Sequence, residues 1–152
     1  MIRVAVQEAA ELHVEPHDRL SNAGIRKLVR ASLAPYAGEG QVTVRLVGEV
    51  ESRELNHRWR GSDRPTNVLA FPAERELGEI GDIVICLPLV RSEASARGST
   101  CPDHLAHLLV HGCLHLVGHD HQEPDQARKM EATESELLVR EGWRDPWKEE
   151  RA

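Results

Sequence analysis

Cysteine is scarce in this sequence, and the three that it has form no recognisable metal-binding or disulfide pattern. Cys86, Cys101 and Cys113 are an odd number, and no two of them form a Cys-x-x-Cys pair. A disulfide scaffold and a four-cysteine zinc site are therefore excluded. This cysteine usage fits a reducing compartment.

Long apolar runs are also missing. The nearest approach to one, residues 83–90, is interrupted by Pro88 and is far shorter than the roughly 20 residues that cross a bilayer. The N-terminal segment becomes acidic at Glu8 before the apolar region of a secretion signal could form. We therefore expect no membrane partner and a cytoplasmic protein.

Positive charge is in deficit. The chain has 19 Lys and Arg against 25 Asp and Glu, a formal net charge of −6. This sign is wrong for a protein that holds nucleic acid through its overall electrostatic field. A role on nucleic acid must therefore depend on a local basic patch.

The length and composition fit one folded domain. The 152 residues are 40% hydrophobic and 29% charged, which excludes a disordered chain. The sequence contains no internal repeat, linker or shift in composition. We expect a single domain over residues 1–152, in which the charged tail over about 144–152 frays.

Hydrophobic periodicity predicts an α/β domain with the element order β, α, β, α, β, β, α, α, α. The strand at 68–71 lies between two prolines, which favours the edge of a sheet, and the strand at 80–86 is more apolar and is expected to be more buried. The expected strands are 2–6, 42–47, 68–71 and 80–86, and the expected helices cover 20–33, the region ending near Gly61, the region from Pro88, 101–117 and the region from Pro124.

The last helix, entered at Pro124, has an amphipathic pattern. Met130 and Leu137 are assigned to its apolar side, and Glu131 and Glu134 to the opposite, polar side.

Histidine is concentrated in one helix and the turn after it. Six of the nine histidines fall within residues 104–121. Thr100 supplies an N-cap with Asp103 three positions later, so a helix is expected to begin here. From Leu105 to Val117 the helix has almost no polar face, and we expect it to run through the core.

Three of these histidines have the spacing of a metal site. His111 and His115 are four residues apart, so on a helix their imidazoles can reach one ion. Gly118 can adopt the left-handed conformation that ends a helix and turns the chain back, which brings His121 to the same ion. Three protein ligands leave a coordination position open, as in catalytic zinc sites.

The remaining histidines are assigned other roles. A histidine pair alone arises by chance fairly often, and the third histidine after a suitably placed glycine is what favours a metal. His104 and His107 lie one turn earlier and are interpreted as core residues or residues that support the ligands. His119 and Asp120 lie in the turn, where either could orient a ligand or merely cap the helix.

Gly112 separates this segment from zinc peptidases. Their His-Glu-x-x-His motif uses the glutamate after the first ligand as general base, and the metzincin form has the same ligand and glycine spacing as residues 111–121. Here that position is Gly112, so a peptidase is disfavoured. Because glycine costs about 1 kcal/mol against alanine inside a helix, we expect another part of the chain to pack closely against Gly112.

A second segment, residues 55–72, is the one locally basic stretch. It carries His57, Arg58 and Arg60 around Trp59 and then enters a strand through a Pro-Thr-Asn turn. By itself this segment could be an ordinary solvated helix end followed by a loop.

Taken together, residues 55–72, Gly81-Asp82-Ile83-Val84-Ile85-Cys86 and the histidine segment resemble the YbeY family of metal-dependent endoribonucleases, the rRNA maturation factors. The family signature His-Gly-x-Leu-His-Leu-x-Gly-Tyr/His-Asp-His is met at every specified position of residues 111–121. One difference is Ala70, where the family's Val-Leu-Ser-Phe-Pro has a serine.

The resemblance implies a small mixed four-stranded sheet with about five helices around it. It implies a single-strand-specific endoribonuclease that hydrolyses RNA phosphodiester bonds in rRNA maturation, including the 3′ end of 16S rRNA, and in ribosome quality control. Partners would be single-stranded RNA, a ribosomal subunit and ribosome-associated proteins. The cofactor would be one Zn²⁺ on His111, His115 and His121, and Arg60 matches the family's functionally important arginine.

The chemistry fits these residues. A guanidinium is always charged and can clamp two phosphate oxygens, which suits Arg60 to the charge that develops on a reacting phosphodiester. Asp120 is a candidate helper base. The sequence leaves open whether the nucleophile is a zinc-activated water or the ribose 2′-hydroxyl, and three imidazoles also suit nickel, cobalt or copper.

Two alternatives from other classes stay open on the sequence. One is a metzincin-like metallopeptidase. The other is a non-catalytic module that uses zinc to hold its fold and binds ribosomal components without cutting them.

Overall fold

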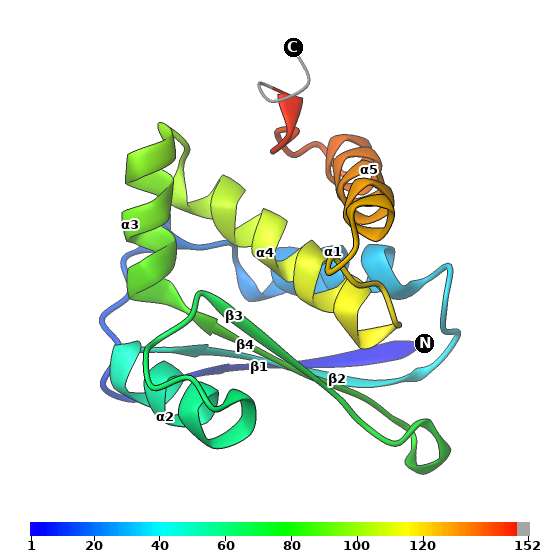
Figure 1. Ribbon diagram of the computed structural model, residues 1–152, viewed down its shortest axis with the longest axis horizontal. Helices are drawn as coiled ribbons and strands as arrows, with labels where there is room; N and C mark the ends of the chain where they lie inside the picture. The colour runs from blue at the N-terminus through cyan, green and yellow to red at the C-terminus, as the bar shows by residue number, and fades with distance from the viewer. Residues whose placement is uncertain (149–152) are drawn as a thin grey trace.

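A computed structural model describes residues 1–148, and within them the chain forms a four-stranded sheet and five α-helices. Helices α1, α3, α4 and α5 lie on one side of the sheet and α2 lies on the other (Figure 1). The strands are β1 (Ile2–Glu8), β2 (Gly40–Val47), β3 (Val68–Pro72) and β4 (Glu79–Cys86), and the helices are α1 (Asn22–Leu33), α2 (Glu49–Arg60), α3 (Leu87–Arg97), α4 (Cys101–Leu116) and α5 (Pro124–Arg140), with short 3₁₀ turns at Pro16–Asp18 and Arg75–Leu77.

The sheet is mixed. Its strand order is β1-β2-β4-β3, with β1, β2 and β4 parallel and β3 antiparallel to β4. β3 is an edge strand and β4 is interior, as the prolines around β3 and the apolar character of β4 predict. The predicted α/β class, element order and mixed four-stranded sheet are therefore confirmed.

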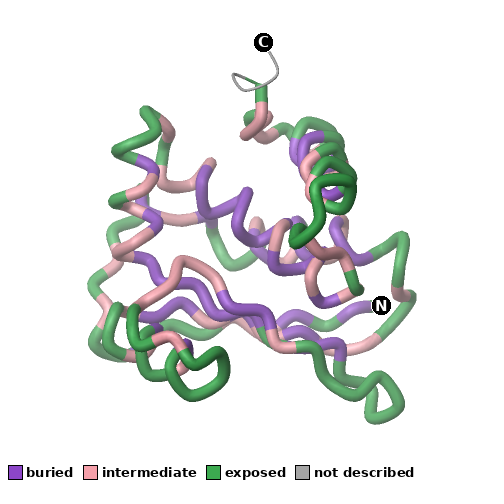
Figure 2. The backbone as a smooth tube through the Cα atoms, viewed as in Figure 1, coloured by how far each residue is buried: buried purple, intermediate pink, exposed green. Residues whose placement is uncertain are grey.

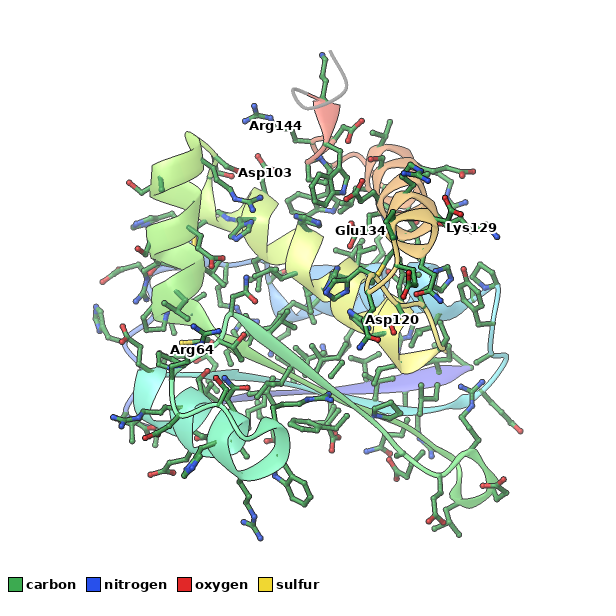
Figure 3. All side chains as sticks on the ribbon, in the orientation of Figure 1. Arg64, Asp103, Asp120, Lys129, Glu134 and Arg144 are labelled. Atoms are coloured by element: carbon green, nitrogen blue, oxygen red, sulfur yellow. The ribbon has the colours of Figure 1, made fainter. Side chains whose placement is uncertain are left out.

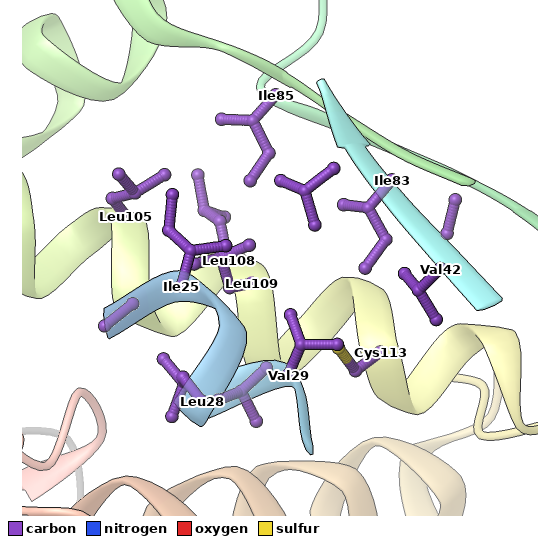
Figure 4. Close-up of a cluster of buried hydrophobic side chains, with 14 of the residues drawn as sticks. Ile25, Leu28, Val29, Val42, Ile83, Ile85, Leu105, Leu108, Leu109 and Cys113 are labelled. Atoms are coloured by element: carbon purple, nitrogen blue, oxygen red, sulfur yellow. The ribbon is translucent and has the colours of Figure 1, made fainter. Parts of the chain in front are cut away.

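An aliphatic core lies between the sheet and helices α1 and α4. Ile83 and Ile85 of β4 face Leu105 and Leu109 of α4, with Val29 of α1 closing the cluster (Figure 4). All five side chains are fully buried. α4 is buried along most of its length (Figure 2), because an almost continuous apolar surface finds partners on all sides.

The helix boundaries follow the expected local signals. The Thr100 hydroxyl accepts a hydrogen bond of 3.1 Å from the Asp103 N–H, which caps α4 as predicted. The prediction was incomplete at α2, which begins at Glu49 and is longer than the short helix expected before Gly61. The Trp59 side chain on that helix is 60% exposed and does not pack inward.

Aromatic residues contribute little to this core. The chain has three tryptophans, one tyrosine and one phenylalanine, and among the described residues only Trp143 packs against the main cluster. Four of the five rings are therefore placed elsewhere.

The segment after α5 is held against the domain as far as it is described. Asp145 accepts hydrogen bonds from the Ser135 hydroxyl at 2.8 Å and the Trp147 N–H at 2.9 Å. Residues 144–148 therefore have polar contacts with side chains of α5, and the prediction that the tail frays from residue 144 stays a prediction. Residues 149–152 of the predicted tail lie outside the described residues.

None of the helices described in residues 1–148 combines the length and the apolar character needed to cross a membrane.

Candidate metal centre

The end of α4 and the turn after it bring three histidines together. His111 and His115 lie one turn apart on α4. At Gly118 the backbone has φ +98°, a conformation that favours glycine, and the His119 N–H bonds back to the Leu114 carbonyl at 3.0 Å. This reversal returns the chain toward α4 and places His121 beside the other two.

The three imidazoles converge. One ligand nitrogen from each histidine lies within 4.8 Å of the other two, and the Nε2 atoms of His111 and His115 are 3.1 Å apart. Two nitrogens bound at about 2.0–2.1 Å with a tetrahedral angle lie about 3.3 Å from each other. The spacing therefore fits a divalent transition metal without rearrangement of the helix.

A buried carboxylate fixes the orientation of one of these rings. The Nδ1 atom of His111 donates a hydrogen bond of 2.6 Å to the Glu134 carboxylate. With the proton on Nδ1, the Nε2 lone pair points away from Glu134, toward His115. Carboxylate–histidine pairs of this kind orient the histidine ligands of metals.

Glu134 is a buried carboxylate that stays ionised beside the three histidines. Its side chain is 1% exposed and also accepts hydrogen bonds from His107 at 3.3 Å and from the Trp147 indole at 2.9 Å. Burial by itself would favour the neutral acid, but the hydrogen bonds from His107 and His111 outweigh it and lower the pKa of Glu134 to about 2. A carboxylate with three donors stays ionised at neutral pH.

The sequence prediction placed Glu134 on the polar side of α5, and the structure shows that this was wrong. Glu134 lies four residues after Met130 and four before Leu138, and residues four apart share one face of a helix. Both neighbours are buried. The spacing therefore contained the signal, and the charge of the side chain concealed it.

His115 is neutral near pH 7. Burial, and after it the neighbouring rings of His111 and His121, lower the pKa of His115 to about 4. A neutral imidazole keeps a lone pair for a metal.

The other two histidines of α4 pair with carboxylates. His104 Nε2 lies 2.8 Å from Glu93 of α3, and His107 bonds to Glu134. Both rings are buried, in accord with their interpretation as core or supporting residues.

The turn residues do not share one role. His119 Nε2 bonds to the Tyr36 hydroxyl at 3.0 Å. The Asp120 carboxylate accepts a hydrogen bond of 2.7 Å from the His121 N–H. Asp120 in the turn and Glu134 on α5 flank the end of α4 (Figure 3).

A pocket of about 570 Å³ opens beside the three histidines, and Arg60 is also among its lining residues. The Arg60 guanidinium donates a hydrogen bond of 2.9 Å to the Ala70 carbonyl. A guanidinium carries five N–H donors, so this single bond positions the group and leaves donors for a ligand. Residues 68–70 and Pro72 of β3 also line the pocket, as does Asp120.

The orientation of β3 follows from its hydrogen bonds to β4. The Asn67 carbonyl accepts from the Cys86 N–H, and the Ala73 N–H donates to the Ile80 carbonyl. Odd-numbered residues therefore direct their backbone groups to β4, whereas Val68, Ala70 and Pro72 direct theirs to the free edge. The Ala70 methyl group packs in the core cluster, so no hydroxyl is offered at the position where a serine was expected.

Gly112 is close-packed, as its cost in a helix predicts. A Cβ atom at this position would lie 3.0 Å from Cγ2 of Ile83. The sheet thus occupies the space that a glutamate side chain would need, which removes the general base of the peptidase alternative.

Comparisons with known proteins identify the family of the chain. The family model described as Endoribonuclease YbeY matches residues 7–142. Endoribonuclease YbeY of Pseudomonas putida (strain W619) is 42% identical over 152 residues, covering 97% of this chain and 94% of the relative. Endoribonuclease YbeY of Stutzerimonas stutzeri is 44% identical over 133 residues, covering 84% and 83%.

A solved structure is similar as well. The solution structure of TM1509 from Thermotoga maritima is matched with a TM-score of 0.59 and 29% identity, covering 92% of this chain and 91% of that one. The family model covers most of the sequence, and the relatives exceed 40% identity over most of its length. The chain therefore belongs to the YbeY endoribonuclease family.

Proposed function

We propose that the protein is a zinc-dependent endoribonuclease that hydrolyses phosphodiester bonds of single-stranded RNA. The observation that carries this proposal is the convergence of His111, His115 and His121 beside a pocket that Arg60 also lines. A metal site alone would suit many hydrolases. An arginine in the same pocket favours a substrate that carries negative charge near the reacting atom.

The donor set supports a borderline-soft divalent metal. Three imidazoles suit zinc, and also nickel, cobalt or copper. Zinc bound to three histidines lowers the pKa of a coordinated water to about 7. His111, His115 and His121 are the proposed ligands, and Glu134 keeps the His111 ring turned so that its Nε2 atom faces the other two.

Arg60 is the proposed phosphate-binding residue. Its bond to the Ala70 carbonyl holds the guanidinium beside the pocket that it lines. A fixed cation that meets charge as it develops on the non-bridging oxygens needs no reorganisation during the reaction. Asp120 lines the same pocket and is the proposed helper base.

We place the activity in the cytoplasm, in maturation of rRNA at the 3′ end of 16S rRNA and in ribosome quality control, within a single catalytic domain over residues 1–152. The net charge of −6 opposes tight binding to RNA at large. A ribosomal subunit or a ribosome-associated protein is therefore proposed to present the RNA. Equal cleavage rates for free and ribosome-bound RNA would contradict this.

An RNA-cleavage assay that tracks metal content tests the proposal. Wild-type protein should cleave single-stranded RNA, lose activity with a chelator and regain it with zinc, whereas His115→Ala should neither bind stoichiometric zinc nor cleave. Zinc that restores only the melting temperature, with no turnover, would instead identify a structural metal. Proteolysis of a peptide library by the zinc-loaded protein would overturn the substrate class.

A further inference from the structure

Two of the five aromatic side chains meet on the surface beside Arg60. Trp59 at the end of α2 and Phe71 of β3 have ring centroids 6.3 Å apart at an interplanar angle of 65°. The Trp59 side chain is 60% exposed, so folding gains little from burying it. In a chain so poor in aromatics, this placement indicates a ligand contact.

The two rings line a hollow on the α2 side of the sheet. Its volume is about 770 Å³, and Leu55 and Val84 provide further apolar walls. The lining also includes polar side chains, among them Gln7 and Thr43, and apolar walls combined with polar groups are typical of ligand sites.

The charges around the hollow nearly cancel. Arg45 donates two hydrogen bonds, of 2.7 and 2.9 Å, to the Glu51 carboxylate. The other charged residues that line the hollow are Arg60 and Asp82, one of each sign. A neutral planar group fits such a surface better than a phosphate does.

The hollow and the metal pocket are separate but share part of their lining. Arg60 and Pro72 line both. The Arg60 guanidinium carbon lies 5.8 Å from the centroid of the Phe71 ring, so one side chain borders the charged pocket and the aromatic pair. A nucleotide chain with a phosphate at Arg60 would bring an adjoining base to Trp59 and Phe71.

We propose that Trp59 and Phe71 form a stacking subsite for one unpaired base of the RNA, next to the phosphate that Arg60 binds. Stacking on an aromatic ring tolerates any base because each base has a π face. A base in a duplex has both faces covered by its neighbours, so this subsite selects single strands. The inference rests on the proposed function and specifies how the substrate is recognised.

The test compares substitutions on α2 in the zinc-loaded protein. Trp59→Ala is expected to raise the KM for single-stranded RNA roughly 5- to 150-fold, the range expected for one lost base–aromatic stack. The kcat, zinc content and melting temperature should stay close to wild type. Trp59→Phe should restore most of the affinity. Val50→Ala is the matched control, because Val50 lies on the same helix, is 73% exposed and does not line the hollow.

A second measurement separates stacking from a structural effect of the substitution. Fluorescence anisotropy reports binding of RNA oligonucleotides that carry one abasic nucleotide, moved position by position. At one position the abasic site should weaken binding, and the same abasic site should cause no further loss in Trp59→Ala. Losses that simply add would overturn the proposal, because independent contacts are additive.

The same binding assay in a His115→Ala background keeps the inference distinguishable from the proposed function. If the wild-type protein cleaves no RNA but Trp59→Ala still removes the penalty at one abasic position, the subsite stands and the nuclease proposal fails. If cleavage is normal and Trp59→Ala binds free RNA like wild type, the subsite is overturned. Loss of ribosomal-subunit binding in that variant would then assign the hollow to a contact with the subunit other than a single-stranded base.

Discussion

The four histidines of α4 form two pairs with different surroundings on one helix. The inner pair, His104 and His107, is buried and bonded to Glu93 and Glu134. The outer pair, His111 and His115, turns its Nε2 atoms toward each other at 3.1 Å and is joined by His121. The inner pair is spaced three residues apart and the outer pair four. Both spacings place two imidazoles on one face of a helix, so residue type and shared face do not by themselves distinguish a ligand from a core residue.

The carboxylates account for the difference. An imidazole nitrogen that faces a carboxylate carries a proton and donates a hydrogen bond to it. An imidazole nitrogen that faces two other imidazoles keeps its lone pair and can bind a cation. His111 does both, since Nδ1 bonds to Glu134 and Nε2 faces His115. His111 therefore belongs both to the histidines that pair with carboxylates and to the candidate metal ligands.

Replacing one histidine from each pair by alanine gives the largest expected difference. His111→Ala should remove stoichiometric zinc binding and reduce RNA cleavage to background. His104→Ala should leave zinc binding intact but destabilise the fold by roughly 1–3 kcal/mol, because Glu93 loses a donor. Metal analysis and thermal unfolding of both variants check this. Zinc loss in His104→Ala would erase the distinction between the pairs.

Arg60→Ala should lower the cleavage rate on the order of 100- to 1000-fold, as the loss of one electrostatic donor typically does. Zinc content and melting temperature should remain at wild-type values, since the ligand set is untouched. Arg64→Ala is the matched control, because Arg64 is an exposed arginine nearby that does not line the pocket (Figure 3). Unimpaired cleavage by Arg60→Ala would remove this residue from the mechanism.

Glu134→Gln tests the carboxylate that bonds to both His107 and His111. The amide keeps the shape of the side chain and removes its charge, so the His111 ring is oriented less firmly. Zinc affinity is expected to fall roughly 10- to 100-fold, measured by competition with a chelator of known affinity. Glu131→Gln, on the same helix, should retain wild-type affinity, and an equal loss in both variants would refute a specific role for Glu134.

The smallest effect is the pH dependence of the metal-free protein. The folded pKa of His115 is about 4 against 6.5 unfolded, so between these values the unfolded chain binds a proton that the fold excludes. Stability should therefore fall as pH decreases from 6.5 toward 4. Glu134 acts later: its contribution is complete above pH 4.5 and is lost as pH falls through its folded pKa of about 2.

The measurement is the melting temperature of the chelated protein from pH 7 to pH 4.5. We expect a decrease on the order of a few degrees, and a smaller decrease in His115→Asn. An identical pH profile for the variant would show that His115 does not set this slope.

Local patterns predict most of this fold and part of the site. The cap at Thr100, the glycine turn at Gly118 and the spacing of His111 and His115 depend on residues close in sequence, and the structure has each of them. Glu134 was missed because its role depends on α5 packing beside α4, a contact between distant segments. The pairing of Trp59 with Phe71 was not predicted either, because the two residues lie 12 positions apart on different elements.

The hydrogen bond from Arg60 to the Ala70 carbonyl also covers part of an open sheet edge. β3 is an edge strand, and an open edge offers backbone groups on which the strand of another molecule can align. Here the guanidinium covers one outward acceptor, and Pro72, two residues on, has no N–H to donate. The side chain proposed to bind the substrate thus also leaves fewer free backbone groups on the β3 edge. We therefore expect Arg60→Ala to aggregate more readily than wild type, in addition to its loss of turnover.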